Sequence, residues 1–198
     1  KQIIFSANAE DLEEGKKAGL SSAMLDRLTL NEKRLQSLIV SLDQVAELPD
    51  PLGIVLDKTV RPNGLEISRI SVPIGVMALI FESRPNVTID AAALAIKSGN
   101  AMILKGGKEA LRSNQALAYC IREALKESKM PEDCVTLIPF KEREATLVLL
   151  KQKDKVDLVI PRGGEGLIRF VAENSLIPVI KHYKGLCHIF IDRDADLN

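Results

Sequence analysis

The chain has 198 residues, of which 46% are apolar, so it is long enough and apolar enough to bury the core of a folded domain. It carries 27 basic and 27 acidic side chains, and this formal net charge of zero argues against general binding to nucleic acid or to a membrane surface. Three cysteines without a C-x-x-C pair favour a reducing compartment, so we expect a cytoplasmic protein, and no apolar run approaches the roughly 20 residues of a membrane span.

The amino-terminal part, residues 1–48, is expected to be helical. Its apolar residues recur with a helical period, first at Leu20, Met24, Leu25 and Leu28, and then at Leu35, Leu38, Ile39, Leu42 and Val45. Thr29 and Glu32 have the spacing of a capping box, which predicts that the second helical stripe begins there. Pro49 and Pro51 should end that helix, because proline lacks a backbone donor and disfavours helix before it. We assign residues 1–53 to this helical part.

Residues 54–72 predict a β-hairpin. Ile54–Val60 and Leu65–Val72 are rich in β-branched residues, and the Asn63-Gly64 pair between them is a strong turn signal. A two-stranded ribbon is only marginally stable in water. We therefore expect the hairpin to need a partner surface, such as another subunit.

Residues 73–198 alternate short apolar runs with helical patterns. The apolar runs are Val76–Phe81, Ala101–Leu104, Val135–Ile138, Val156–Ile160, Ile177–Ile180 and His188–Ile191. The helical patterns between them are Ile89–Ser98, Ser113–Ser128, Arg143–Gln152 and Glu165–Asn174. This alternation is typical of βαβ units, so the sequence predicts an α/β fold with a doubly wound parallel sheet.

Two glycine-rich turns follow predicted strands, at the sheet edge where ligands bind in such folds. The first is Lys105-Gly106-Gly107-Lys108, and the second is Arg162-Gly163-Gly164, which opens a helix. Glycine lets a ligand approach the backbone, the basic side chains supply charge, and the free N–H groups of a helix start attract phosphate. Either one alone is also consistent with an ordinary solvated turn. Two in one sheet favour a phosphate-bearing ligand.

A third strand end carries Glu82, Ser83, Arg84 and Asn86 within five residues, and we take these four as candidate substrate-binding residues. Arg84 is a candidate to clamp a carboxylate or phosphate in a bidentate fork. The alternative is a surface pair of Glu82 with Arg84, and an Asn86 that caps the helix that follows. For Asn86 we favour the capping interpretation.

The cysteines give no clear nucleophile. Cys120 lies among apolar residues of a helix and is expected in the core, and Cys134 precedes a strand without a visible activator. Cys187 stands next to His188, but neighbours in a strand point to opposite faces, so we consider Cys187 an unlikely nucleophile. His182 is either a surface or a site residue. No cluster has metal-ligand spacing, so we expect no metal.

Six segments together resemble the gamma-glutamyl phosphate reductases, also called glutamate-5-semialdehyde dehydrogenases, of the aldehyde dehydrogenase superfamily. They are Val72-Pro73-Ile74-Gly75-Val76, Phe81-Glu82-Ser83-Arg84-Pro85, Lys97-Ser98-Gly99-Asn100, Leu104-Lys105-Gly106-Gly107-Lys108-Glu109, Ile160-Pro161-Arg162-Gly163-Gly164 and Cys187-His188-Ile189. The resemblance implies a Rossmann-like sheet of the aldehyde dehydrogenase type. It also implies NADPH-dependent reduction of L-glutamyl 5-phosphate to L-glutamate 5-semialdehyde, with release of phosphate, in the second step of L-proline biosynthesis. The family's cysteine thiolate forms a thioester that the hydride reduces.

The resemblance also implies roles for individual residues. Lys105 would contact the adenosine ribose of the cofactor, and Lys108 stands where NAD-preferring relatives often carry a glutamate, so its charge should favour the 2′-phosphate of NADPH. The turn at 162–164 would lie beneath the pyrophosphate. His182 stands roughly where the superfamily has its general-base glutamate, a loss that suits an enzyme that must avoid hydrolysing its thioester. The superfamily's oxyanion asparagine has no secure match: Glu82 falls at its position and Asn86 lies nearby.

The family's nucleophile belongs to a Cys-Asn-Ala-like motif that does not occur in these 198 residues. We therefore expect Lys1 and Asn198 to be cuts, the catalytic-cysteine domain to lie beyond Asn198, and this chain to bind cofactor without turnover. Two alternatives are an isolated nucleotide-binding module and the reductase part of a bifunctional kinase–reductase. Expected partners are glutamyl 5-phosphate, a second copy of the chain bound through the hairpin, and glutamate 5-kinase as a candidate.

Overall fold

The computed structural model describes residues 1–182, 190–193 and 195, and begins with three helices. These are α1 (Gln2–Lys17), α2 (Ser22–Leu28) and α3 (Glu32–Glu47), so the helical prediction is confirmed and α3 ends before Pro49. The predicted capping box is wrong. Asn31 caps α3 by accepting from the Arg34 N–H at 2.9 Å, whereas the Thr29 hydroxyl donates to the Leu25 carbonyl at 2.7 Å, at the end of α2.

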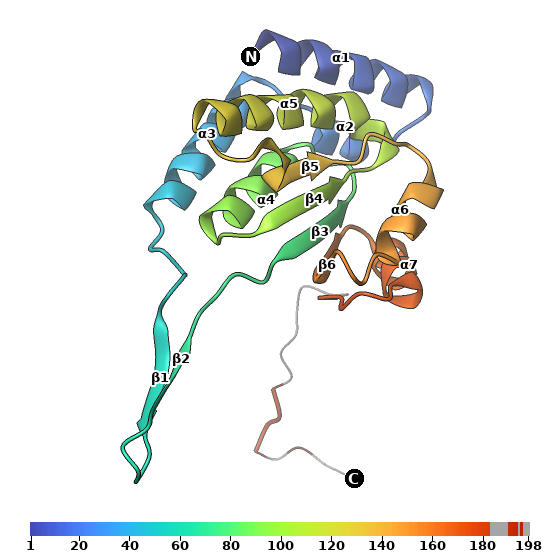
Figure 1. Ribbon diagram of the computed structural model, residues 1–198. Helices are drawn as coiled ribbons and strands as arrows, with labels where there is room; N and C mark the ends of the chain where they lie inside the picture. The colour runs from blue at the N-terminus through green and yellow to red at the C-terminus, as the bar shows by residue number, and fades with distance from the viewer. Residues whose placement is uncertain (183–189, 194, 196–198) are drawn as a thin grey trace.

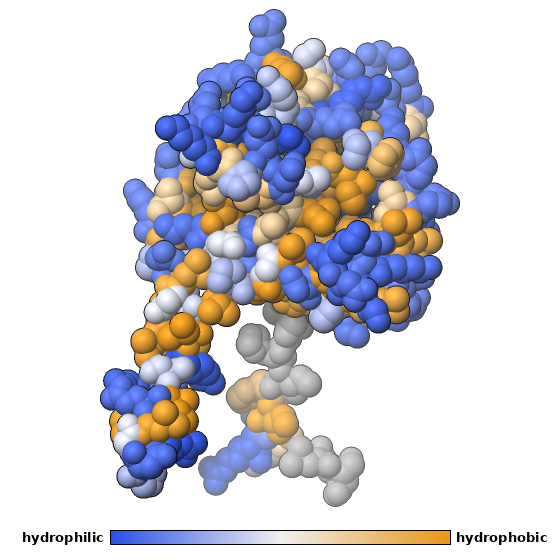
Figure 2. Space-filling view, viewed as in Figure 1, coloured by the Kyte–Doolittle hydropathy of each residue, from blue (hydrophilic) through white to orange (hydrophobic). Residues whose placement is uncertain are grey.

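A hairpin of β1 (Val55–Val60) and β2 (Glu66–Ile70) follows, as predicted, and projects away from the rest of the chain (Figure 1). Gly64 has φ +83°, a left-handed conformation that the turn requires and that glycine adopts readily. Every residue of both strands is exposed. Figure 2 shows apolar side chains along the ribbon, and the large exposed ones are Val55, Leu56, Val60, Leu65, Ile67 and Ile70.

The rest of the chain forms the predicted parallel sheet, in the order β5-β4-β3-β6. Its strands are β3 (Val76–Phe81), β4 (Ala101–Lys105), β5 (Val135–Leu137) and β6 (Leu158–Arg162). Its helices are α4 (Asn86–Lys97), α5 (Leu111–Glu127), α6 (Arg143–Leu150) and α7 (Glu165–Asn174), with short 3-10 turns η1 (Lys108–Ala110) and η2 (Glu132–Cys134). The α/β class is therefore confirmed.

Two predicted strands near the end of the chain have different outcomes. Ile177–Ile180 does not form a strand, but Val179 makes an isolated parallel bridge to Val159 and extends the sheet beside β6. Of the predicted strand His188–Ile191, the first two residues lie outside the described residues, and the last two are not in a strand.

Both faces of the sheet are covered by apolar clusters, because alternate residues of β3 point to opposite sides. One cluster joins Met77, Leu79 and Phe81 to α4 and α5, and the other joins Ala78 and Ile80 to α6, α7 and β6. A third cluster packs α1 and α3 against α5, so the amino-terminal helices form an outer layer (Figure 1). Cys120 and Cys134 pack, partly buried, against these clusters. None of the helices in the described part of the chain is long and apolar enough to cross a membrane.

The parallel sheet is built outward from β3 in both directions. The connections through α4 and α5 step from β3 to β4 and β5, whereas α6 returns the chain to β6 on the opposite side of β3. The carboxyl ends of β3 and β6 are therefore the topological switch point, where open α/β sheets form a crevice.

Candidate functional site

A pocket of about 490 Å³ lies at this switch point. It is lined by Met24, Arg27, Glu82, Ser83, Arg84, Glu109, Arg162, Gly163 and Gly164. The fold therefore brings together the loops after β3 and β6 and, through Glu109, the end of the turn after β4. The amino-terminal helix α2 supplies the other wall.

The turn after β6 already holds an anionic group. The Gly164 N–H donates to the Glu82 carboxylate at 3.0 Å, and the Glu82 N–H donates to the Arg162 carbonyl at 3.2 Å. A Cβ atom on Gly163 would lie 2.4 Å from the Glu82 carboxylate, so only glycine allows this approach. The backbone at the start of α7 thus donates to a carboxylate oxygen, as expected of free N–H groups at a helix amino terminus. An ion pair of Glu82 with Arg84 is not formed within the described residues, so that alternative is wrong.

The turn after β4 presents two lysines in opposite environments. The Lys105 side chain is buried, and its Nζ donates to the Gly106 carbonyl at 3.0 Å. Burial lowers the pKa of Lys105, while the charges of Glu109 and Glu142 act in the opposite direction. Lys108 is exposed on η1. Neither lysine lines the pocket at the switch point, but the next residue, Glu109, does.

Gly106 and Gly107 are tightly surrounded. A Cβ atom on Gly106 would lie 2.1 Å from the Asn114 side-chain nitrogen, and one on Gly107 would lie 2.3 Å from a Glu109 carboxylate oxygen. The absence of side chains here lets the turn pack closely on the start of α5.

Ser83 is held in place by Glu109. Its N–H and its hydroxyl donate to one oxygen of that carboxylate, at 2.6 and 2.8 Å. The Ser83 backbone has φ +46°, which non-glycine residues adopt rarely, and these two hydrogen bonds stabilise it there. Ser83 therefore lines the pocket with its hydroxyl already engaged. No pattern in the sequence predicted this contact between the loops that follow β3 and β4.

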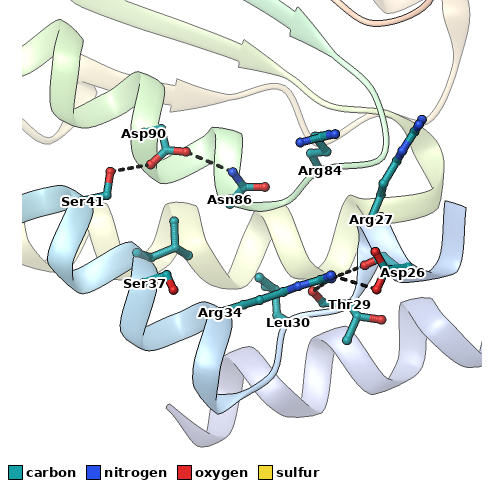
Figure 3. A pocket seen from close by; sticks show the side chains of 11 residues that line it. Asp26, Arg27, Thr29, Leu30, Arg34, Ser37, Ser41, Arg84, Asn86 and Asp90 are labelled. Atoms are coloured by element: carbon teal, nitrogen blue, oxygen red, sulfur yellow. Dashed lines mark hydrogen bonds and ion pairs between the residues drawn. The ribbon is translucent and has the colours of Figure 1, made fainter. Parts of the chain in front are cut away.

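A second pocket of about 390 Å³ adjoins the first and lies between α2, α3 and the start of α4 (Figure 3). Arg27 and Arg84 line both pockets. Asn86 lines only the second, and its side-chain N–H donates to the Asp90 carboxylate at 3.0 Å. The prediction that Asn86 caps α4 is wrong, because the helix begins at Asn86 itself and Pro85 occupies the N-cap without a side-chain bond.

The contributions of Met24, Arg27 and Asp90 were not predicted. Met24 and Arg27 form no motif with the loops, because α2 lies far away in the sequence, and Asp90 lies inside α4, past the strand ends where site residues were sought. Cys187 falls outside the described residues. His182 is exposed and lines neither pocket. Within residues 1–182, 190–193 and 195, no group of three or more His, Cys, Asp or Glu residues could hold a metal ion, and the absence of a metal site stays a prediction.

Comparisons with known proteins identify related chains. A family model of the aldehyde dehydrogenases matches residues 24–198. The gamma-glutamyl phosphate reductase of Desulfotalea psychrophila is 56% identical over 197 residues, and that of Xanthomonas campestris is 54% identical over 196. These alignments cover 100% and 99% of this chain but 47% of each relative, so the chain spans about half the length of the curated relatives it matches.

Solved structures give a consistent result. The crystal structure of gamma-glutamyl phosphate reductase from Thermotoga maritima superimposes with a TM-score of 0.92 at 46% identity, covering 98% of this chain and 47% of that one. The Saccharomyces cerevisiae enzyme of the same name gives 0.81 at 38% identity, covering 99% of this chain and 50% of that one. An aldehyde dehydrogenase from Listeria monocytogenes, 16% identical with a TM-score of 0.63, shares the fold.

Proposed function

The chain belongs to the aldehyde dehydrogenase family, and from this premise we propose that it is the cofactor-binding part of an enzyme that reduces L-glutamyl 5-phosphate with NADPH. The products are L-glutamate 5-semialdehyde and phosphate, as in the second step of L-proline biosynthesis. The observation that carries this proposal is the similarity over the whole chain to reductases of that name. The pocket at the switch point and the smaller pocket that adjoins it are consistent with a cofactor and a small anionic substrate that meet there.

The residues of the two glycine-rich turns fit a nicotinamide cofactor. NADPH supplies the hydride when it is bound. The Gly164 N–H at the start of α7 donates to an anionic oxygen, here that of Glu82, and we assign the pyrophosphate to Arg162, Gly163 and Gly164, where it would displace the Glu82 carboxylate. Lys105 and Lys108 would bind the adenosine ribose and its 2′-phosphate, and Gly106 and Gly107 would let the turn that carries them pack closely on Asn114 and Glu109.

The nucleophile is a cysteine outside these 198 residues. This sequence contains no Cys-Asn-Ala-like motif, and Cys120 and Cys134 pack against the apolar core. The remaining half of the protein would supply that thiolate. Residues 73–198 then form the cofactor-binding core, and residues 54–72 the hairpin through which copies associate. A cytoplasmic location and an association with glutamate 5-kinase belong to the same proposal.

The reaction can be tested in reverse with the complete protein. We expect L-glutamate 5-semialdehyde to reduce NADP only when inorganic phosphate is present, because an acyl-phosphate reductase releases its thioester to phosphate and not to water. NADPH absorbance measures the rate, and the same assay without phosphate is the control. Equal rates with and without phosphate would contradict the proposal, because they would indicate a hydrolytic aldehyde dehydrogenase.

A further inference from the structure

Two arginines on the border of the two pockets have no side-chain partner among the described residues. Arg27 comes from α2 and Arg84 from the loop between β3 and α4, and both side chains line both pockets. Figure 3 shows them at the smaller pocket. Within the described part of the chain, neither guanidinium makes a hydrogen bond or an ion pair. Both residues are exposed, so their charges are available to a ligand.

The third arginine of the smaller pocket is already neutralised. Arg34 binds the Asp26 carboxylate at 2.8 Å and the Thr29 carbonyl at 2.9 Å, and it also donates to the Asp26 carbonyl. Its role is to tie α3 to the end of α2. The net positive charge of the pocket therefore comes from Arg27 and Arg84.

One carboxylate in the same pocket has no cationic partner in the described part of the chain. Asp90, half-buried on α4, accepts from the Ser41 hydroxyl at 3.2 Å with one oxygen and from the Asn86 amide at 3.0 Å with the other. Both donors are neutral, and no basic group forms an ion pair with Asp90 within the described residues. The two hydrogen bonds fix the carboxylate and leave its charge uncompensated (Figure 3).

We infer that the smaller pocket receives the α-amino-acid head of the substrate, with its carboxylate on Arg27 and Arg84 and its ammonium on Asp90. This inference rests on the proposed function. A zwitterion matches two cations and one anion that face the same pocket, whereas a phosphate dianion would be repelled by Asp90. Because the two arginines also border the pocket at the strand ends, the reacting end of the substrate extends from the head toward Gly163.

The test compares three aldehydes in the phosphate-dependent reverse reaction of the complete protein. L-glutamate 5-semialdehyde carries both head groups, 4-aminobutanal lacks the carboxylate, and 5-oxopentanoate lacks the ammonium. For Arg27→Gln and Arg84→Gln we expect KM for the semialdehyde to rise about tenfold or more, since each loses a charge-assisted hydrogen bond. The kcat/KM for 4-aminobutanal should stay within about twofold, because that aldehyde has no carboxylate to lose.

Asp90→Asn provides the reciprocal measurement. It should lower kcat/KM for the semialdehyde by about tenfold and leave that for 5-oxopentanoate within about twofold. Lys33→Gln is the control, because it removes one positive charge from an exposed position of α3 that lines neither pocket, and all three aldehydes should react as before.

The outcomes separate the inference from the proposed function. If each arginine variant slows all three aldehydes equally, or none of them, the assignment of the head group is wrong while the reductase activity stands. If the unmodified protein does not oxidise the semialdehyde with NADP and phosphate, the proposed function fails and the inference fails with it.

Discussion

Lys108 is the residue that should decide between the two nicotinamide cofactors. Its side chain is exposed on η1 and has no ion-pair partner within the described residues, so its charge is free to meet a 2′-phosphate. We predict that Lys108→Glu weakens NADPH binding about tenfold or more and leaves NADH binding within about threefold. Titration of each cofactor by nicotinamide fluorescence measures both affinities. Lys153→Glu, a similar charge reversal at an exposed lysine, is the control. Equal losses of affinity for NADPH and NADH would show that Lys108 does not bind the 2′-phosphate.

Lys105 illustrates the opposite case, a lysine whose charge is unfavourable in the folded protein. Burial lowers its pKa below the ordinary 10.5, and its one hydrogen bond to the Gly106 carbonyl does not replace its hydration. We predict that Lys105→Met raises the free energy of unfolding at neutral pH by about 1 kcal/mol, while cofactor binding weakens. Urea denaturation measures the first effect and cofactor titration the second.

The pH dependence of the stability difference between Lys105→Met and the unmodified protein follows from the direction of the pKa shift of Lys105. Between the lowered pKa of folded Lys105 and the ordinary value in the unfolded chain, the unfolded chain binds more protons, so stability from this group rises with pH. The advantage of the methionine variant should therefore be full at neutral pH and shrink as the pH approaches 10.5. An advantage that is independent of pH would mean that packing, and not charge, explains it.

At the scale of elements, α5 depends on α1 for its cap. Its own N-cap, Ala110, offers no side-chain bond. Instead, the buried Asp11 carboxylate of α1 accepts from the Ser113 N–H and hydroxyl, both at 2.7 Å, and from the Arg112 N–H at 3.3 Å. An anion at a helix amino terminus is favourable, so this contact joins the amino-terminal layer to the helix that follows the lysine turn.

We predict that Asp11→Asn lowers the free energy of unfolding by about 2 kcal/mol, because the amide removes the charge and leaves buried donors of α5 less well satisfied. Urea denaturation followed by circular dichroism measures it. Glu14→Gln is the matched control on the same helix. The Glu14 carboxylate accepts from Arg112 at 2.6 Å but is solvent-exposed, so the urea concentration at the midpoint of unfolding should hardly change. Similar losses in both variants would indicate that α1 docks through surface charge and not through the buried cap.

Elements that a nearby sequence pattern marks could be predicted. Features that depend on two residues competing for one capping position, or on contacts between residues far apart in the sequence, could not. The bounds of β3 and α7 were predicted as found, because an apolar run and a glycine turn mark them directly. Thr29 was wrongly predicted to cap α3 because Asn31, two residues later, offers a competing oxygen. The cap of α5 comes from a residue about a hundred positions away. The presence of Arg27 and Arg84 in one pocket likewise depends on the tertiary fold.

At the scale of the whole molecule, the hairpin is the part that the chain itself does not stabilise. Both strands are exposed throughout, although the ribbon carries six large apolar side chains: Val55, Leu56, Val60, Leu65, Ile67 and Ile70. Its visible internal support is the ladder itself and an exposed ion pair of Lys58 with Glu66 at 2.9 Å. Such a ribbon is marginal alone, and exposed apolar strands attract partners.

We predict that the double substitution Ile67→Asp and Ile70→Asp reduces the oligomeric size of the complete protein. Ile67 and Ile70 differ in register by an odd number of positions, so they point to opposite faces of the ribbon and the pair disrupts either face. Light scattering after size exclusion measures the mass, and an unchanged circular dichroism spectrum should accompany the loss. Asn63→Asp is the control, because it adds charge at the turn and keeps the oxygen that accepts from the Leu65 N–H at 3.1 Å. An unchanged mass in the double variant would mean that the hairpin is not the surface that joins the copies.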